Sequence, residues 1–363
     1  MMLKENEIVR VKQQQELQAI QLEQSQAEVK QGRMMVLFAF VGIAFVLILL
    51  IISTRAYVLK QKSNKELAEQ KDEISEKNEE LSQQNDEIAA QRDEIEAQRD
   101  MVFSQKEQIE KTHNDISASI DYATRLQDSI LPNSDLLKKS FSDHFVFFRP
   151  KQKVSGDFYW WTRVDKQVVV VAADCTGHGV PGAFMSMLGV SLLREVVNKE
   201  YITQPGVILS RLRKEVIRSL GQKGAIGEQK DGMDLALISL NPETGKCEYA
   251  GANNPLYLIR DGRLSEYKPD RMPVSYYQEM DKFTTHEIQL QPGDQLYMFS
   301  DGYADQFGGE NRKKFKYKAF QQLLLDNSGK SMDLQHKSLH DTIIKWQGDF
   351  EQIDDMVIVG IKI

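Results

Sequence analysis

One stretch near the start of the chain is apolar almost throughout. Residues Met34 to Ile52 read MMVLFAFVGIAFVLILLII and include no charged residue and no proline. A run of about 19 such residues is long enough to cross a bilayer as a helix. A buried helix of a soluble domain would carry polar positions on one face. A signal peptide would end in a small-residue cleavage site, whereas Ser53-Thr54-Arg55 leads into charged sequence. The pattern predicts a retained transmembrane helix over residues 34–52.

The basic residues that flank this run predict its direction. Two precede it and four follow it: Lys30 and Arg33, then Arg55, Lys60, Lys62 and Lys65. Because positive charge favours the cytoplasmic side, we expect the C-terminal bulk to lie in the cytoplasm. The chain is then a single-pass protein of the inner (cytoplasmic) membrane. Residues 1–33 form a short charged helical segment, too short for a sensory domain.

A seven-residue repeat follows the apolar run. From Gln70 to Lys111 the chain reads QKDEISE, KNEELSQ, QNDEIAA, QRDEIEA, QRDMVFS and QKEQIEK. One seam position is apolar throughout: Leu67, Ile74, Leu81, Ile88, Ile95, Val102, Ile109 and Ile116. A strict heptad predicts a left-handed coiled coil, here a parallel homodimer stalk over residues 53–113. The second seam position is mostly polar, as at Asn78 and Asn85, so both a signal-responsive rod and a passive spacer stay open.

The pattern changes again before the C-terminal domain. Residues 114–132 keep a helical apolar face until Pro132, which predicts a linker helix. Residues 133–363 then alternate between strand-like and helix-like segments. HFVFFRP, QVVVVAAD, DLALISL, QLYMFSD and MVIVGIKI read as strands, and GAFMSMLGVSLLREVVN, GVILSRLRKEVIRSL and MDLQHKSLHDTIIKWQ read as helices. Short turns such as Asp261-Gly262 favour antiparallel sheets covered by helices, an α+β domain.

Four aspartates stand where predicted strands meet turns. They are Asp157 in VSGDFYW, Asp174 in VAADCTGHG, Asp301 in MFSDGYAD and Asp354 in QIDDMVIVG. Each alone is an ordinary turn residue. Together, beside glycines that allow close backbone approach, such carboxylates can converge on hard divalent cations.

These segments resemble a known family. FRPKQKVSGDFYW, ADCTGHGVPGAFMSMLG, DGMDLALISLNPETGKCEYAGANNPLYLIRDG, PGDQLYMFSDGYADQ and DDMVIVGIKI occur in the order typical of SpoIIE-type phosphatases, the bacterial branch of the PPM-type serine/threonine phosphatases. The resemblance covers residues 115–363 and includes the helix ATRLQDSILP. It implies the PPM phosphatase fold, an α-β-β-α sandwich of two antiparallel sheets flanked by helices, preceded here by the transmembrane helix and the coiled coil.

The resemblance also implies a centre of two Mn²⁺ or Mg²⁺ ions. By position, Asp174 would bridge both ions and act in catalysis with Asp157. Asp157 and the backbone carbonyl of Cys175 would hold one ion, and Asp301 and Asp354 the other, with Asp355 beside them. Two such ions lower the pKa of a shared water and neutralise charge on the phosphoryl oxygens. Carboxylates favour Mg²⁺ or Mn²⁺, and the two cysteines of the chain give neither a zinc cluster nor a disulfide framework.

Other residues of these motifs have open roles. His178 is a candidate proton donor, but a turn histidine bonded to the backbone is the interpretation we favour. Gly177, Gly179 and Gly182 are expected to allow close backbone packing at the metals, and Asn253 and Asn254 to cap turns. The chain departs from the family at Ser155, where Gly is frequent, and at Val357, where Thr is frequent. Arg149 is a weak candidate for a phosphate clamp.

The predicted function is the metal-dependent hydrolysis of phosphoserine or phosphothreonine on a partner protein in bacterial partner-switching signalling. The family implies a phosphorylated regulator, such as an anti-anti-sigma-like protein. A catalytically silent scaffold with the same fold is the alternative. A sensor histidine kinase fits poorly, because His113 lacks the expected phosphoacceptor context and Asp301 and Asp354 would have no role. The net charge of −7 and the lack of a basic, aromatic-interleaved patch exclude a general nucleic-acid binder.

Overall fold

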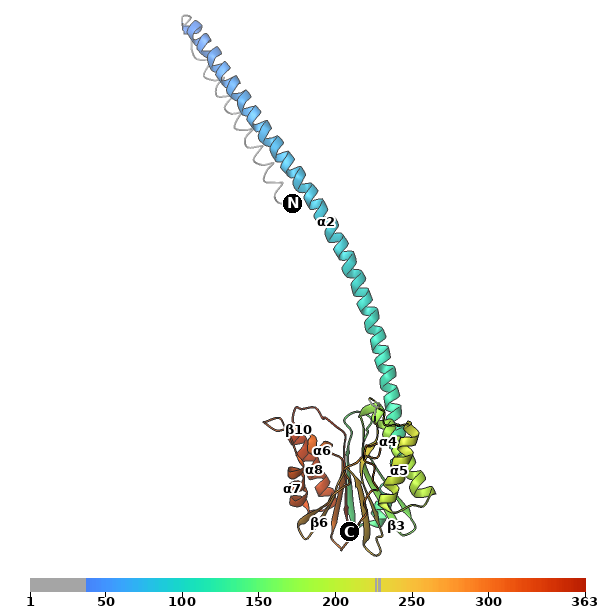
Figure 1. The fold of residues 1–363 in the computed structure, drawn as a ribbon. Helices are drawn as coiled ribbons and strands as arrows, with labels where there is room; N and C mark the ends of the chain where they lie inside the picture. Colours follow the sequence, from blue (N-terminus) through green and yellow to red (C-terminus); the bar gives the residue numbers. More distant parts are fainter. Residues whose placement is uncertain (1–36, 226, 228–229) are drawn as a thin grey trace. The chain divides into compact units, whose positions relative to one another are not determined.

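The chain divides into two compact units, Met1–Lys106 and Glu107–Ile363. The structure, a computed structural model, describes residues 37–225, 227 and 230–363, and it describes side chains from residue 53 onward, except at residue 56. A single helix, α2 (Leu37–Ile130), begins in the first unit and ends in the second (Figure 1).

In the first unit the described residues all belong to α2. The apolar seam of the predicted stalk is exposed on this single helix, with Leu67 at 65%, Ile88 at 57% and Ile95 at 64% exposure. Apolar side chains at heptad spacing are stable in water when a second helix covers them, so the exposed seam fits the predicted coiled coil. The partner helix stays a prediction.

The predicted membrane anchor, residues 34–52, lies partly within the described residues. The charged segment 1–33 and Met34 to Val36 lie outside the described residues, and residues 37–52 are helical in their backbone. Among the residues that are described, one helical stretch has the length and apolar composition to cross a membrane, Gly179–Lys199, with a mean hydropathy of 1.4. It is 56% buried inside the second unit, so it is a core helix of that unit.

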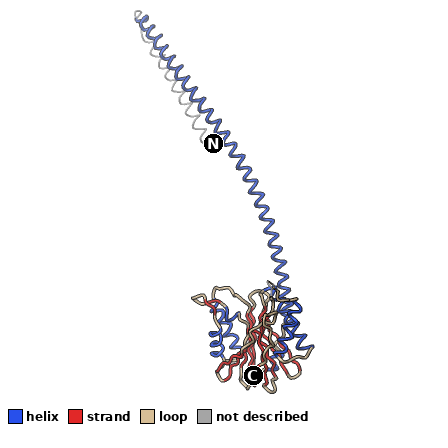
Figure 2. Tube along the Cα trace, in the orientation of Figure 1, coloured by secondary structure: helices blue, strands red, loops and turns tan. Residues whose placement is uncertain are grey.

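The second unit is built in four layers. Figures 1 and 2 show strands at its centre and helices on both outer sides. One five-stranded sheet has the order β1-β12-β9-β6-β7, and the other has the order β2-β3-β4-β5-β8. All neighbouring strands in both sheets are antiparallel. The predicted α-β-β-α sandwich is confirmed.

The elements of each layer are as follows. The first sheet comprises β1 (Asp143–Arg149), β6 (Leu256–Arg260), β7 (Arg263–Tyr267), β9 (Gln295–Phe299) and β12 (Met356–Lys362). The second comprises β2 (Phe158–Val164), β3 (Gln167–Cys175), β4 (Met233–Leu240), β5 (Lys246–Ala252) and β8 (His286–Gln289). The helices of the unit, besides the end of α2, are α3 (Asp135–Ser140), α4 (Gly179–Leu193), the π-helix η2 (Arg194–Lys199), α5 (Pro205–Leu220), α6 (Gly302–Asp305), α7 (Tyr317–Asn327) and α8 (Met332–Gln347), and a short ribbon is formed by β10 (Phe307–Gly308) and β11 (Lys313–Lys314).

Burial on both faces explains the unbroken apolar run of β3. Val168, Val170 and Ala172 belong to the core between the two sheets. Val169, Val171 and Ala173 belong to the core under α4 and α5. Because side chains alternate along a strand, a strand covered on both faces needs apolar residues at every position.

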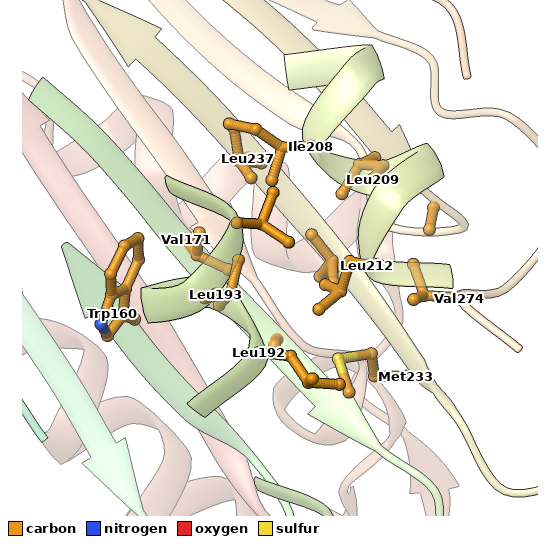
Figure 3. Packing of buried hydrophobic residues seen from close by; sticks show 14 of the residues in the cluster. Trp160, Val171, Leu192, Leu193, Ile208, Leu209, Leu212, Met233, Leu237 and Val274 are labelled. Atoms are coloured by element: carbon orange, nitrogen blue, oxygen red, sulfur yellow. The ribbon is translucent and has the colours of Figure 1, made fainter. Parts of the chain in front are cut away.

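Each outer helical layer has its own core. Figure 3 shows Leu192 and Leu193 of α4 with Ile208, Leu209 and Leu212 of α5, packed over Val171 and Leu237 of the second sheet. On the opposite side, Phe145 and Phe147 of β1 and Tyr297 and Phe299 of β9 lie under α6, α7 and α8. Burying one such aliphatic side chain is worth about 1.5–3 kcal/mol, so these three cores hold the layers together.

The predicted turn at Asp261-Gly262 is present. Both residues have positive φ, 47° and 71°, and they join β6 to β7 with Arg260 opposite Arg263. This geometry matches the right-handed twist of the strands, which is why Asp-Gly favours two-residue hairpins.

Candidate metal centre

The predicted carboxylates gather at one end of the two sheets. Asp157 comes just before β2, and Asp174 is the penultimate residue of β3. Phe158 pairs with Ala173, so these two aspartates lie on neighbouring strands. In the other sheet Asp301 follows β9 and Asp354 precedes β12, whose Ile358 pairs with Phe299. Antiparallel pairing thus brings the end of one strand beside the start of the next, and four separate segments meet.

A cavity of about 660 Å³ opens at this end. Asp174, Cys175, Gly177, His178, Asp301 and Asp354 line one part of it. Its lining also includes Lys230, Asp234, Asn253, Ser275, Tyr276 and Tyr277. Asp157 is 2% exposed and Asp355 is 1% exposed, so both are buried in the protein beneath the more open carboxylates.

The electrostatics of this region favour cations. Burial, then the charges of neighbouring aspartates, holds the pKa of Asp174 well above its usual value. Burial likewise holds the pKa of Asp157 well above normal, and burial followed by the charge of Asp354 raises that of Asp301 to about 6. Each of these carboxylates is costly to ionise beside the others, and a positive ion between them would remove that cost.

Orphaned oxygen atoms test whether such ions fit. The buried Oδ2 of Asp157 has no hydrogen-bond partner among the described residues. An ionised, buried oxygen without a donor is unfavourable unless a cation binds it. The set offers hard oxygen donors, which suit Mg²⁺ and Mn²⁺. In the part of the chain that the structure describes, no three Asp, Glu, His or Cys side chains are grouped closely enough to hold a metal ion. The donor types and the burial of these carboxylates fit divalent cations.

Asp355 plays a different part from its neighbour Asp354. Its Oδ1 accepts the backbone N–H of Lys151 at 2.6 Å, and its Oδ2 accepts that of Gly156 at 2.7 Å. Both oxygens thus hold the β1–β2 loop, the segment 150–157 that carries Asp157.

The glycines of this region pack the loops against each other. Gly177 and Gly179 have φ of +86° and +66°, the left-handed region that favours glycine. A Cβ at Gly156 or Gly182 would clash with the carbonyl oxygen of Gly177. This close approach brings the Asp157 segment beside the DCTGHG turn.

His178 has a side-chain partner. Its Nε2 lies 2.9 Å from the ammonium of Lys151, and its ring lines the cavity. We expected a bond from this ring to the backbone, and the contact with Lys151 stands in its place. His178 therefore belongs to the cavity lining, and Lys151 lies behind it as its hydrogen-bond partner.

The asparagines of GANNP are structural in part. Asn253 has φ of 56° and donates from Nδ2 to Asp234 Oδ1 at 2.8 Å. Asn254 is buried, and its backbone oxygen accepts the hydroxyl of Tyr249 at 2.7 Å.

Arg149 ends β1 opposite Met356, and its role as a phosphate clamp stays a prediction. Side chains alternate along β1, so Arg149 shares a face with Phe145 and Phe147, which belong to the core under α8. Burial raises the pKa of Asp354, and the positive charge of Lys151, two residues beyond Arg149, offsets part of that rise.

Sequence reasoning missed Asp234, Lys151 and Lys230. Asp234 had a readable signal, because it lies in DGMDLALIS at the start of a predicted strand. Lys151 and Lys230 lie in loops without periodicity, and their closeness to the site is set by tertiary packing.

Comparison with known proteins identifies the family. A family model described as Stage II sporulation protein E (SpoIIE) matches residues 164–363, more than half of the chain. The chain belongs to the SpoIIE family. The phosphoserine phosphatase RsbU of Bacillus subtilis (strain 168) is 21% identical over 255 residues, which cover 68% of this chain and 71% of RsbU.

Solved structures agree with the SpoIIE assignment. The SiaA-PP2C domain of Pseudomonas aeruginosa is 28% identical, with a TM-score of 0.63 over 69% of this chain and 98% of that domain. The RsbU and RsbW domains of Rv1364c from Mycobacterium tuberculosis share the fold, with a TM-score of 0.50, 17% identity and coverage of 61% of this chain and 59% of that one. The prediction of a SpoIIE-type PPM phosphatase, a protein serine/threonine phosphatase, is confirmed.

Proposed function

We propose that this SpoIIE-family chain hydrolyses phosphoserine or phosphothreonine on a partner protein at a centre of two Mn²⁺ or Mg²⁺ ions. The observation that carries the proposal is the meeting of Asp157, Asp174, Asp301 and Asp354 at one end of the sandwich. A scaffold without catalysis would have no need to keep four mutually repelling carboxylates in one place.

The ligand roles follow from position. Asp174, whose pKa responds to Asp157, Asp301 and Asp354, would bridge the ions. Asp157 and the Cys175 carbonyl, which faces Gly156, would hold one ion. Asp301 and Asp354 would hold the other. Bound there, the ions would lower the pKa of a shared water and neutralise the charge of the phosphoryl group.

Besides the metal ligands, cationic side chains of the protein would orient the phosphoryl group for attack by water. His178 lines the cavity, and the ammonium of Lys151 lies 2.9 Å from its Nε2. Lys230 lines the cavity from the far side, with its ammonium over the ring of Tyr276 at 5.7 Å. Such cations attract and orient a phosphoryl oxygen, and we assign this role chiefly to Lys151 because it stands beside Asp354.

The partner is proposed from the relatives. RsbU of Bacillus subtilis is a phosphoserine phosphatase, and the Mycobacterium tuberculosis protein joins an RsbU domain to an RsbW domain. We propose that the substrate here is a phosphorylated regulator of the anti-anti-sigma kind. Residues 34–52 would anchor the chain in the inner membrane with the phosphatase domain in the cytoplasm, and the stalk would pair two chains in parallel.

The test is the release of phosphate from a phosphoserine peptide by the full chain. We expect turnover with Mn²⁺ or Mg²⁺ that EDTA abolishes and added metal restores. A chain that binds a phosphoprotein equally well with and without metal, and never releases phosphate, would instead be the scaffold.

A further inference from the structure

The segment after α6 carries a high density of positive charge. Residues 306–318 read QFGGENRKKFKYK, with five basic residues against one acidic residue, in a chain whose net charge is −7. Within this segment β10 pairs with β11 as a short antiparallel ribbon, and α7 begins just beyond it. We call residues 306–318 the basic ribbon. It follows α6, and α6 directly follows the candidate ligand Asp301.

Two contacts hold the basic ribbon against α6. The N–H of Lys316 donates to the carbonyl oxygen of Ala304 at 2.6 Å. The ammonium of Lys314 pairs with the carboxylate of Asp305 at 2.6 Å. The ribbon is thus fixed to the short helix that begins beside Asp301, at the end of the sandwich where the candidate metal ligands meet.

Trp346 of α8 holds the ribbon from another side (Figure 1). Its indole Nε1 donates to the carbonyl oxygen of Gln306 at 3.0 Å, and its own carbonyl oxygen accepts the N–H of Gly309 at 2.8 Å. A Cβ at Gly308 would clash with the same carbonyl oxygen. The backbone of the ribbon is therefore held in place, so its charges occupy fixed positions.

The five cations of the ribbon fall into two groups. The guanidinium of Arg312 lies over the ring of Phe350 at 5.5 Å, and Lys314 is paired with Asp305. The other three side chains are exposed and form no salt bridge with any residue that the structure describes: Lys313, Lys316 and Lys318. These three charges are available to another molecule.

Two of the available charges oppose the stability of α7. A helix is stabilised by acidic residues in its first turn and by a side-chain cap, because the positive end of its dipole lies there. The first turn of α7 has no acidic residue, and its N-cap residue, Lys316, makes no side-chain cap hydrogen bond. Lys318 adds a further positive charge to this turn. An anion bound from outside would turn this unfavourable start into a favourable one.

The aromatic residues of the ribbon indicate which kind of anion fits. RKKFKYK interleaves basic and aromatic residues, so the chain does contain one run of the kind that nucleic-acid binders use. In the fold, however, Phe315 packs against Tyr303 and Trp346. Tyr317 lies against Phe299. Rings engaged in this way are not free to stack on bases. The ribbon offers fixed charges without a stacking surface, which suits the acidic side chains of a protein.

We propose that the basic ribbon is a docking surface for an acidic face of the phosphoprotein substrate, next to its phosphoserine. This inference rests on the proposed function and adds a specificity element to it. Exposed cations beside an active site attract an acidic partner and speed its association, and salt screens their effect. The ribbon would thus select phosphoproteins that carry acidic residues around the phosphoserine.

The test uses two variants of the full chain. The ribbon variant removes the three available charges and keeps polar side chains: Lys313→Gln, Lys316→Gln and Lys318→Gln. The control variant removes the same charge from exposed lysines of α3 and of the β2–β3 turn, which lie at the opposite end of the strands from the aspartates: Lys138→Gln, Lys139→Gln and Lys166→Gln. All six side chains are exposed, so we expect both variants to fold.

The substrates are two phosphoserine peptides of equal length, one with glutamates and one with glutamines on both sides of the phosphoserine. The kcat/KM for each peptide is measured in detergent with Mn²⁺, at about 0.05 M and about 0.5 M salt. At low salt the ribbon variant should lose about 3- to 30-fold in kcat/KM for the glutamate peptide, mainly through a higher KM, because three charge pairs are lost. For the glutamine peptide it should stay within about twofold of the parent.

The remaining outcomes separate this inference from the proposed function. At high salt the parent and the ribbon variant should converge, and the control variant should match the parent on both peptides. Equal values for the parent and the ribbon variant on the glutamate peptide, or equal losses on both peptides, would overturn the inference and leave the proposed function intact. A parent chain that releases phosphate from neither peptide would overturn both.

Two other anionic partners are tested with the same variants. The chains are reconstituted in phosphatidylcholine vesicles with and without phosphatidylserine, and binding of a labelled single-stranded DNA is followed by fluorescence anisotropy. A loss of turnover in the ribbon variant that needs phosphatidylserine and is equal for both peptides would assign the ribbon to the membrane surface. Loss of DNA binding with unchanged peptide kinetics would assign it to a nucleic acid. Either result would overturn the inference.

Discussion

Asp174 of β3 and Asp234 of β4 lie directly opposite each other in the antiparallel register of the second sheet. Like charges in such a cross-strand pair destabilise a sheet. Asp234 accepts one hydrogen bond from Asn253, and burial raises its pKa. Two carboxylates at this position lower the stability of the sheet unless a cation binds close to them. The pair therefore marks a region suited to binding cations.

This pairing makes a prediction for Asp234→Asn. In EDTA the unfolding temperature of the variant should rise by about 1–4 °C, because a charge repulsion worth about 0.2–1 kcal/mol is removed while an acceptor for Asn253 remains. Asp165→Asn, at a positive-φ turn of the same sheet, is the control and should shift by less. An unfolding temperature of Asp234→Asn several degrees below that of the parent would contradict a repulsion between the carboxylates of Asp174 and Asp234.

The raised pKa values predict a pH dependence of stability. Asp157, Asp174 and Asp301 have a higher pKa in the folded protein than in the unfolded chain, so between these values the native state binds more protons. The free energy of unfolding without metal then falls as pH rises through this window. In EDTA, lowering the pH from about 7.5 to about 5.5 should raise the unfolding temperature. In saturating Mn²⁺ the same change should raise it less, because protons compete with the metal.

Asp301→Asn provides the internal control for this experiment. Asp301 has a pKa of about 6, inside the window, so its removal should reduce the stabilisation on acidification in EDTA. Identical pH slopes with EDTA and with Mn²⁺ would contradict the assignment of these carboxylates to the metals.

Lys151 should matter for substrate binding. Its ammonium lies 2.9 Å from His178 Nε2 at the cavity wall. Loss of a hydrogen bond to a charged group costs about 1.5–3 kcal/mol, so Lys151→Ala should lower kcat/KM about 10- to 100-fold, mainly through a higher KM. The control is Lys166→Ala, since Lys166 is exposed and pairs with Glu243 at the surface. Equal kcat/KM values for the two variants would show that Lys151 does not contribute to substrate binding.

The stalk can be tested by disulfide trapping. Ile88 lies on the seam and is 57% exposed on the single helix, and Ala90 lies on the far face. In a parallel dimer, equal seam positions of two chains meet. Ile88→Cys should therefore cross-link to its own copy under mild oxidation much faster than Ala90→Cys. The native Cys175 and Cys247 are buried and should not interfere. Equal rates at both positions would exclude this seam.

Strands covered on both sides were the easiest to predict. The runs of β3 and β12 are apolar at nearly every position because one face meets the opposite sheet and the other meets helices. The edge strand β7 carries exposed and half-buried residues, so its sequence looks like that of a loop. The hairpin turn before it was predictable, because Asp261-Gly262 adopts the positive φ angles that these residues tolerate.

The identity of the candidate ligands could be predicted from the sequence, whereas the contacts between side chains could not. Asp157, Asp174, Asp301 and Asp354 were found because each stands in a motif of the family. The hydrogen bond from Gln127 to Ser155 could not be predicted this way. The two residues are 28 apart in the sequence, and the contact depends on how a helix packs against a loop. The partner of His178 was missed for the same reason.

The central claim is that the carboxylates around Asp174 hold the ions that activate water. The most direct measurement is phosphate release from a phosphoserine peptide by the full chain in Mn²⁺, with Asp174→Asn beside Asp261→Asn, a matched change in the distant β6–β7 turn. The account predicts that Asp174→Asn loses at least about a thousandfold in kcat and that Asp261→Asn keeps the parent rate. Metal-dependent turnover by Asp174→Asn at the parent rate would contradict it.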